Sequence, residues 1–320
     1  MSENLKHFSF FFLLLGLFAF SACTAGPNYK RPAVDVPGTY RGPTPEADAN
    51  AKPDKTETST ASLGDEKWWE VFQDRELQGL IRTALQKNYD VRIAATRVLQ
   101  AQAQLGITRA NQFPAVSGGA AVSTQHNPPL GPTPSYEITP KQVTASGAWA
   151  LDFWGQYRRA TEAARANLLA NEWARKQVIA TLVANVATAY FQLRQLDLEL
   201  EISKRTFNSR KESLDLTRTL EQHGISSLLD VRQSEQLVYT AAAEIPDLER
   251  QIQQQENAIN IALGNNPGDV PRGLRLTEQP HAPEVPAGLP SSLLEQRPDI
   301  RAAEANLIAA NAQIGVARAA

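Results

Sequence analysis

The sequence predicts a mainly α-helical protein with a small antiparallel β part, arranged around an internal repeat. Three observations carry this prediction. Long tracts without proline show helical periodicity, and residues 113–154 instead alternate between apolar and polar side chains with a period of two. In addition, a segment that begins at Leu85 recurs from Leu294. The chain therefore contains one complete structural unit and the start of a second.

Composition excludes several classes of function. The 32 basic and 34 acidic residues give a formal charge of −2, which offers no basic surface for nucleic acid. His7, His126, His223 and His281 lie far apart, and no cysteine or acidic cluster has the spacing of metal ligands. We therefore expect no enzyme activity, no cofactor and no metal site.

The N-terminus has the features of a lipoprotein signal peptide, assigned to residues 1–22. The apolar run at residues 8–20 is shorter than the roughly 20 residues that a membrane-spanning helix needs. Small residues then precede Cys23, the only cysteine in the chain, which has no partner for a disulfide. We expect Cys23 to carry the lipid, although a chance cysteine after an ordinary signal peptide remains the alternative.

An irregular segment and two helices follow. Residues 23–66 are rich in Pro, Thr and Ala without apolar periodicity, which predicts an extended strap or, alternatively, a disordered tether. Within residues 67–112, Asp74 is expected to cap a helix that begins at Arg75, and Asp90 to cap a second helix. The second helix carries a seam of mostly small residues at heptad spacing: Ala94, Val98, Ala101, Leu105 and Thr108.

Residues 113–154 are predicted to form a pair of long antiparallel strands, with a turn-rich stretch at 126–137 between them. Each strand has one apolar and one polar face and is long enough for a membrane β-barrel, whose strands need roughly 9–11 residues. An ordinary soluble hairpin is the alternative. The aromatic residues expected at the membrane interface are Trp149, Phe153, Trp154 and Tyr157.

Residues 155–264 are predicted to form a long helical hairpin. The stretch 155–223 lacks proline and turn signals, and as one helix it would measure on the order of 100 Å. It carries two buried stripes, as in helices that close into a hollow cylinder, although a solid bundle remains possible. Gly224 is expected to end this helix in the left-handed conformation, Ser227 to start the return helix, and Pro246 to bend it.

The internal repeat limits how the strands can assemble. The segment from Leu85 aligns without a gap on the segment from Leu294, after a Pro-rich linker at residues 265–290. Residues 291–320 are therefore expected to be the first helices of a truncated second copy. Two complete copies would supply four strands, whereas membrane barrels have at least about 8, so the barrel is expected to be shared between subunits.

Six separated segments resemble one known family. GPNYKRP, WWEVFQDREL, AWALDFWGQYRRA, HGISSLLDV, LERQIQQQENAINIALG and QRPDIRAAEANL are similar to segments of TolC/OprM-type outer-membrane efflux proteins, in the lipoprotein branch that works with RND pumps. The resemblance implies a homotrimer, with a β-barrel in the outer membrane, a long α-helical barrel across the periplasm and an equatorial collar. The helices of residues 67–112 and the linker would contribute to that collar.

The resemblance also implies a function and partners. The protein would be a lipid-anchored outer-membrane duct for drugs or other small molecules, embedded in outer-membrane lipid and supplied by an inner-membrane RND-type pump through a periplasmic adaptor. The residues that correspond to the adaptor-contacting tip are His223, Gly224, Ile225, Ser226 and Ser227. A type I protein secretion duct and a periplasmic coiled-coil lipoprotein scaffold remain the alternatives. The substrate, the cognate pump and the gating residues of the second copy are not indicated.

Overall fold

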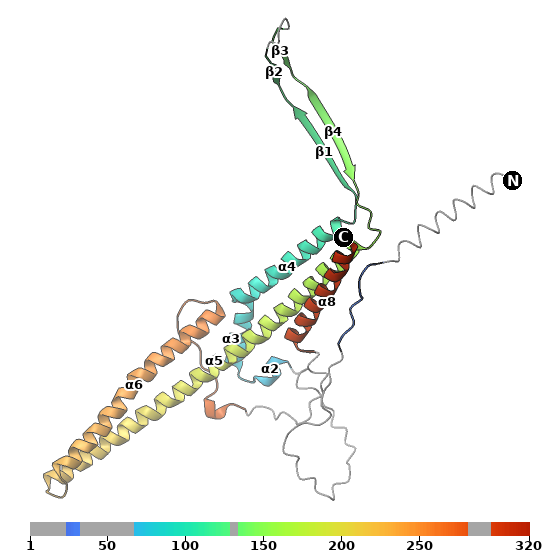
Figure 1. Ribbon diagram of the computed structural model, residues 1–320. Helices are drawn as coiled ribbons and strands as arrows, with labels where there is room; N and C mark the ends of the chain where they lie inside the picture. Colours follow the sequence, from blue (N-terminus) through green and yellow to red (C-terminus); the bar gives the residue numbers. More distant parts are fainter. Residues whose placement is uncertain (1–23, 33–66, 129–133, 281–295) are drawn as a thin grey trace, which may run out of the picture. The chain divides into compact units, whose positions relative to one another are not determined.

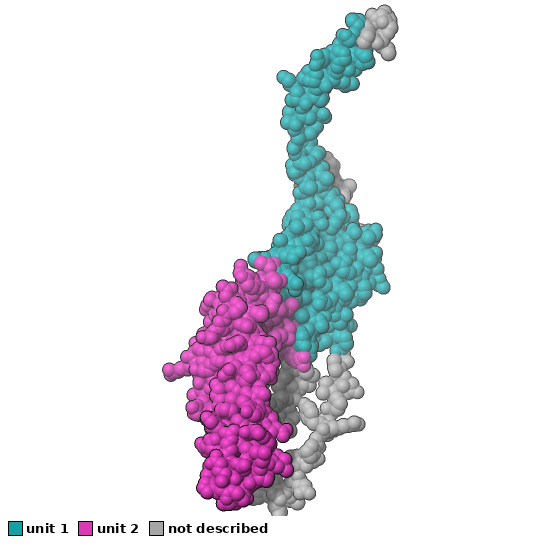
Figure 2. All heavy atoms as spheres, turned by 90° about the vertical axis from the view of Figure 1, so that its left-hand side faces the viewer, with its two compact units in different colours: residues 1–34, 97–173, 299–320 teal, residues 35–96, 174–298 magenta. Residues whose placement is uncertain are grey.

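The computed structural model describes residues 24–32, 67–128, 134–280 and 296–320. The chain divides into two compact units, and each is considered by itself (Figure 2). The described elements, labelled in Figure 1, are α2 (Trp68–Val71), α3 (Arg75–Lys87), α4 (Tyr89–Ala110), β1 (Ala115–Val122), β2 (Gln125–Asn127), β3 (Tyr136–Ile138), β4 (Lys141–Ala148), α5 (Gln156–Gln222), α6 (Leu228–Leu263), the 3-10 helix η1 (Leu276–Glu278) and α8 (Pro298–Ala319).

Unit 1 comprises residues 1–34, 97–173 and 299–320, and includes all four strands. Strand β1 pairs with β4 and β2 with β3, both antiparallel, so that the strands form one long interrupted hairpin (Figure 1). Val116 lies opposite Gly147, and Ala120 lies opposite Val143. Directly paired residues share a face, so the apolar positions of both strands lie on one side, as the alternation predicts.

The prediction of two uninterrupted long strands is wrong in one detail, because each is broken into two. The break falls at Ser123 and Thr124 on one arm and at Thr139 and Pro140 on the other. Pro140 has no N–H to donate to a ladder, although its carbonyl oxygen still accepts a 3.2 Å hydrogen bond from the Ser123 N–H. The interruption is therefore local, and the hairpin continues through β2 and β3.

Unit 2 comprises residues 35–96 and 174–298, and its core joins helices α3, α5 and α6. Helix α3 begins at Arg75, where the carboxylate of Asp74 accepts hydrogen bonds from the backbone N–H groups of Glu76 and Leu77, as predicted. The fully buried apolar side chains of this core include Leu77, Ile81 and Ala84 from α3, Val186 and Leu193 from α5, and Ile259 from α6. These positions have the i, i+3, i+4 spacing of helical apolar faces.

The predicted cap of α4 is wrong. Helix α4 begins at Tyr89, and the side chain of Asn88 accepts hydrogen bonds from the N–H groups of Asp90 and Val91 at 2.8 and 3.2 Å. The side-chain amide of Asn88 also donates to the carbonyl oxygen of Ala262 in α6. Asn88 thus caps the helix and binds a second element, which a short-range pattern does not reveal.

Helices α5 and α6 are joined by a tight turn. Helix α5 is continuous over 67 residues. Gly224 follows it with a φ of +72°, and the Ile225 N–H donates to the Leu220 carbonyl oxygen at 2.9 Å. Ser227 and Asp230 form the predicted capping box at the start of α6. Pro246 lies inside α6, which remains one helix from Leu228 to Leu263.

None of the helices in the described ranges combines the length and the hydropathy that a transmembrane helix requires.

Candidate functional sites

The tip of the helical hairpin is formed by five residues, His223, Gly224, Ile225, Ser226 and Ser227, which connect α5 to α6. The carboxylate of Asp230 accepts hydrogen bonds from both serine hydroxyls and from the Ser227 N–H, at distances of 2.6 to 2.9 Å. These bonds, led by the one from the Ser227 side chain, hold the pKa of Asp230 below its ordinary value. These local hydrogen bonds therefore fix the turn without covering its outer surface.

Exposed aliphatic side chains surround this turn. Ile225 is 74% exposed, and Leu228 and Leu229, the first two residues of α6, are also exposed. These two leucines are not among the tip residues predicted from the sequence. The sequence did contain a signal for them. Two leucines that directly follow a capping serine lie in the first turn of a helix, where few neighbouring residues cover them. Together with Ile225 they form an apolar patch of the kind that protein partners bind.

The passage from β4 to α5 carries the four predicted interface aromatics. Trp149, Phe153 and Trp154 are exposed, whereas Tyr157 is half-buried in the first turn of α5. The indole N–H of Trp149 donates to the carbonyl oxygen of Gln112 at 3.2 Å. Three large aromatic rings thus point outward at the base of the strand hairpin in unit 1.

The described part of the strap lies against helices of the same unit. Arg31 donates two hydrogen bonds of 2.6 Å to the carboxylate of Glu304 in α8, and Asn311 of α8 donates to the Pro27 carbonyl oxygen at 2.9 Å. Residues 24–32 are therefore held in place, unlike a free tether. Cys23, the expected lipid-attachment residue, lies outside the described residues.

A groove of about 540 Å³ lies among α4, α5 and α8 in unit 1. Its lining is rich in side-chain amides: Gln100, Gln104, Asn167, Asn171 and Gln313. Gln313 is two residues from Asn311, which contacts the strap, so the two side chains project from opposite sides of α8. The groove and the strap therefore lie on opposite faces of α8.

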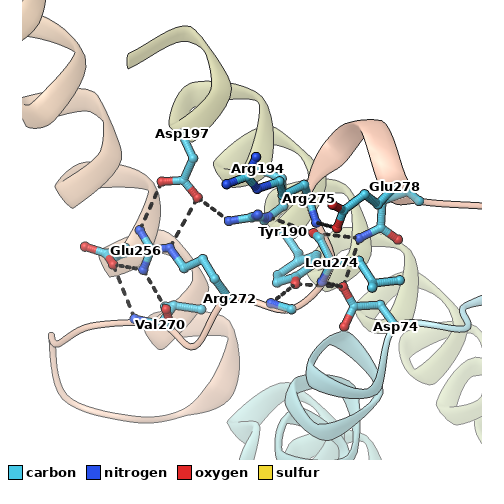
Figure 3. A network of polar contacts seen from close by, with 12 residues as sticks. Asp74, Tyr190, Arg194, Asp197, Glu256, Val270, Arg272, Leu274, Arg275 and Glu278 are labelled. Atoms are coloured by element: carbon cyan, nitrogen blue, oxygen red, sulfur yellow. Dashed lines mark hydrogen bonds and ion pairs between the residues drawn. The ribbon is translucent and has the colours of Figure 1, made fainter. Parts of the chain in front are cut away.

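In unit 2, a buried carboxylate holds the connecting segment after α6 (Figure 3). Asp74, only 2% exposed, accepts hydrogen bonds from the Tyr190 hydroxyl at 2.9 Å, the Leu274 N–H at 3.0 Å and the Gln279 amide at 2.9 Å. The Tyr190 oxygen in turn accepts from the Gly273 N–H at 2.8 Å. One side chain thus caps α3 and fixes residues 273–279.

A second polar cluster adjoins the first in Figure 3. Arg272 donates to the carboxylates of Asp197 and Glu256, and Glu256 also accepts from the Val270 N–H at 3.3 Å. Arg194 pairs with Asp197 at 2.7 Å and donates to the Leu274 carbonyl oxygen. Charges of both signs are therefore matched where the connecting segment crosses α5 and α6.

Within the described ranges, no three His, Cys, Asp or Glu side chains are grouped as metal ligands, and every buried side-chain N or O atom has a hydrogen-bond partner. A buried polar atom without a partner would have indicated a bound ligand. The polar clusters of unit 2 instead have the closed hydrogen bonding of structural networks.

Comparison with known proteins agrees with the fold. Residues 80–265 match the outer membrane efflux protein family. The chain is 36% identical over 312 residues to the probable efflux pump outer membrane protein TtgC of Pseudomonas putida, covering 96% of this chain and 63% of that protein. It is 31% identical over 303 residues to the cation efflux system protein CusC of Escherichia coli, covering 94% and 63%.

Two solved structures share the fold. A crystal structure of CusC superposes with a TM-score of 0.76 at 31% identity, over 93% of this chain and 64% of that one. The open state of the MtrE outer membrane channel of Neisseria gonorrhoeae superposes with a TM-score of 0.75 at 31% identity, over the same shares.

The fold and the matches define a class of non-enzymatic outer-membrane efflux proteins with a TolC-like fold. The chain belongs to the outer membrane efflux protein family. It spans about 63% of the length of the curated relatives it matches.

Proposed function

We propose that the full-length protein is the outer-membrane channel subunit of a tripartite efflux system. Three copies form a passive exit duct for drugs or other small molecules, which an inner-membrane RND-type pump delivers through a periplasmic adaptor. The duct is lipid-anchored through Cys23, lies in the outer membrane and extends into the periplasm. It contains no cofactor, and it does no chemistry on what it carries.

The strand hairpin is the single observation that carries this proposal. Every residue of β1 and β4 is exposed, and the hairpin has an apolar face with valines such as Val116 and Val143 but no core beneath it. An isolated two-stranded sheet is marginally stable in water. Strands of the second repeat and of neighbouring subunits would pair with its open edges. Lipid would cover its apolar face, as in a closed membrane barrel.

Two further features support a duct. The exposed aromatics at the base of the hairpin suit a membrane–water interface, where Trp and Tyr are enriched. The groove lies on the face of α8 opposite the strap and is lined mainly by side-chain amides, with Arg97 as its charged residue, and such a polar wall suits the passage of unrelated solutes. The relatives' names agree with this role, since they describe outer membrane proteins of antibiotic and toluene efflux pumps and a protein of a cation efflux system.

Arginine substitutions on the two faces of β4 test the proposal. Val143 belongs to the apolar face, and Thr144 points to the other face. In the full-length protein, Val143→Arg is expected to cost about 2–4 kcal/mol per subunit, because the charge would enter lipid. The expected result is loss of heat-modifiable trimer and of antibiotic tolerance in a channel-deleted strain with the cognate pump and adaptor.

Thr144→Arg is the matched control, because the same charge would face the lumen and the protein is expected to keep both properties. Equal tolerance of the two arginines would contradict a lipid-facing surface. A periplasmic scaffold gives neither heat-modifiable migration nor ion conductance in planar bilayers. A type I protein secretion duct would conduct but would export a polypeptide and leave drug tolerance unchanged.

The tip is proposed to contact the adaptor through its apolar patch. Ile225→Asp places a charge where an apolar side chain would be buried in the complex, so we expect crosslinking to the adaptor to fall at least about tenfold. Ile261→Asp is the control, because Ile261 is 75% exposed but lies near the far end of α6. Trimer assembly is expected to survive in both variants. Unchanged crosslinking of the Ile225 variant would remove this residue from the adaptor contact.

A further inference from the structure

The strap makes an unusual set of contacts for a segment without secondary structure. Its N-terminal part binds the segment just before α5, where the Ala25 N–H donates to the Trp154 carbonyl oxygen at 3.0 Å. Its later part binds α8 through Asn311 and Glu304. Nine residues therefore bridge two helices whose contacted residues, Arg159 and Glu304, lie 145 positions apart in the sequence.

Arg159 in the first turn of α5 is the centre of this bridge. It is only 4% exposed, and its guanidinium donates to the carbonyl oxygens of Ala25 and Gly26 and to the side chain of Asn28, at 2.8 to 3.2 Å. Its remaining bond goes to Glu162, one turn along α5. A buried guanidinium needs acceptors for its donors, and here the strap supplies three of them. Without the strap, Arg159 would lose most of its partners.

Two glycines allow the strap to approach α8 closely. Gly26 has a φ of +90°, and a Cβ there would collide with the backbone of Gly315. A Cβ on Gly315 would lie 2.8 Å from the Ala25 carbonyl oxygen. Larger side chains at either position would therefore push the strap away from α8.

The internal repeat shows that this site is specific to the second copy. At the offset of 209 residues, Gly315 corresponds to Gly106, which has open space where a Cβ would be. Glu304, which binds Arg31, corresponds to Ala95, and Asn311 corresponds to Gln102. The first copy keeps the glycine but lacks the carboxylate. A single strap can therefore distinguish two similar helices by charge.

We propose that residues 24–32 form a clasp that fastens α5 of the first repeat to α8 of the second, with Arg159 as its positioning residue. The clasp holds α8 in place and fixes Ala25 beside Trp154, at the base of the strand hairpin. A group attached to the chain before residue 24 is therefore connected through the clasp to helices of both repeats. This role depends only on contacts within unit 1. It does not depend on which solute the duct carries.

Trypsin cleavage measures how often the clasp opens. Lys30 lies within it, and cleavage there requires the strap to leave the helices, whereas the Arg31–Pro32 bond resists trypsin. In full-length protein purified in detergent, Arg159→Ala and Gly26→Val are each expected to speed cleavage after Lys30 at least about tenfold. Arg165→Ala is the control, because it removes an exposed arginine from the same helix. Rates are normalised to synthetic peptides with the same strap sequence.

Amide hydrogen exchange then distinguishes a strap that holds α8 in place from a strap that is bound without stabilising α8. Arg31→Ala removes the bonds of the strap to Glu304 without adding atoms at α8, so faster amide exchange in residues 299–320 with unchanged exchange in α6 is the result expected of a clasp. Unchanged exchange in α8 despite faster cleavage would overturn the fastening role. Cleavage at the wild-type rate in Gly26→Val would overturn the clasp altogether.

Discussion

Replacement of Asp74 by alanine is expected to lower the free energy of unfolding by about 3 kcal/mol. The substitution removes the cap of α3 and leaves the Tyr190 hydroxyl, the Leu274 N–H and the Gln279 amide without their shared acceptor. Denaturant unfolding followed by circular dichroism measures the loss. Glu76→Ala is the control, because it removes an exposed carboxylate from the same helical turn and is expected to cost less than about 1 kcal/mol.

The contribution of Asp74 is also expected to depend on pH. Burial acts to raise its pKa, but hydrogen bonds from Gln279, Tyr190 and the backbone N–H groups of Leu77 and Leu274 outweigh it, so the pKa lies below its ordinary value. A carboxyl group with a depressed pKa stabilises the fold above its unfolded pKa of about 3.9, and this contribution is lost as the pH falls through the folded pKa. The difference between wild type and Asp74→Ala should therefore shrink below about pH 4.

Tyr190 remains a donor throughout this range. Burial, together with the neighbouring Asp74 carboxylate, raises the pKa of Tyr190 to about 12, although its bond from the Gly273 N–H acts in the other direction. Its hydroxyl therefore stays protonated throughout the acid range of this test. A stability difference that stayed constant down to pH 2 would contradict the assignment of an ionised Asp74.

Replacement of Arg272 by methionine is expected to have the second large effect, a loss of about 2–3 kcal/mol. Methionine keeps much of the volume but removes the donor to the buried carboxylate of Glu256 and the contact with Asp197. Burial acts to lower the pKa of Arg272, but its bonds to Glu256 and Asp197 raise it above its ordinary value. The guanidinium is therefore always charged.

A double variant separates the ion pair from other effects of the substitution. Glu256→Gln in the Arg272→Met background removes the unpaired buried charge, so the double variant is expected to be more stable than Arg272→Met alone. Arg275→Met, at an exposed position three residues further, is expected to change the free energy of unfolding by less than about 0.5 kcal/mol. Equal losses at Arg272 and Arg275 would show that the cluster does not stabilise the connecting segment.

Local signals in the sequence determined several of the elements and their ends. The cap at Asp74, the left-handed Gly224 and the Ser227 capping box each depend on bonds within a few residues, so their patterns predicted them correctly. The two-residue alternation likewise predicted which residues of β1 and β4 share a face. The internal repeat is also a property of the sequence, because the segment from Leu85 recurs without a gap from Leu294.

Only the tertiary structure decided the contacts between distant segments. Asn88 replaces Asp90 as the cap of α4 and also binds α6, and Asp74 binds residues about 200 positions away. The strap reads as irregular from composition, yet Arg159 and Glu304 hold its described part, residues 24–32, against two helices. Such bonds depend on which side chains the fold brings together. A local pattern carries no information about partners so far along the chain, because polar residues next to each other in space need share no spacing in sequence.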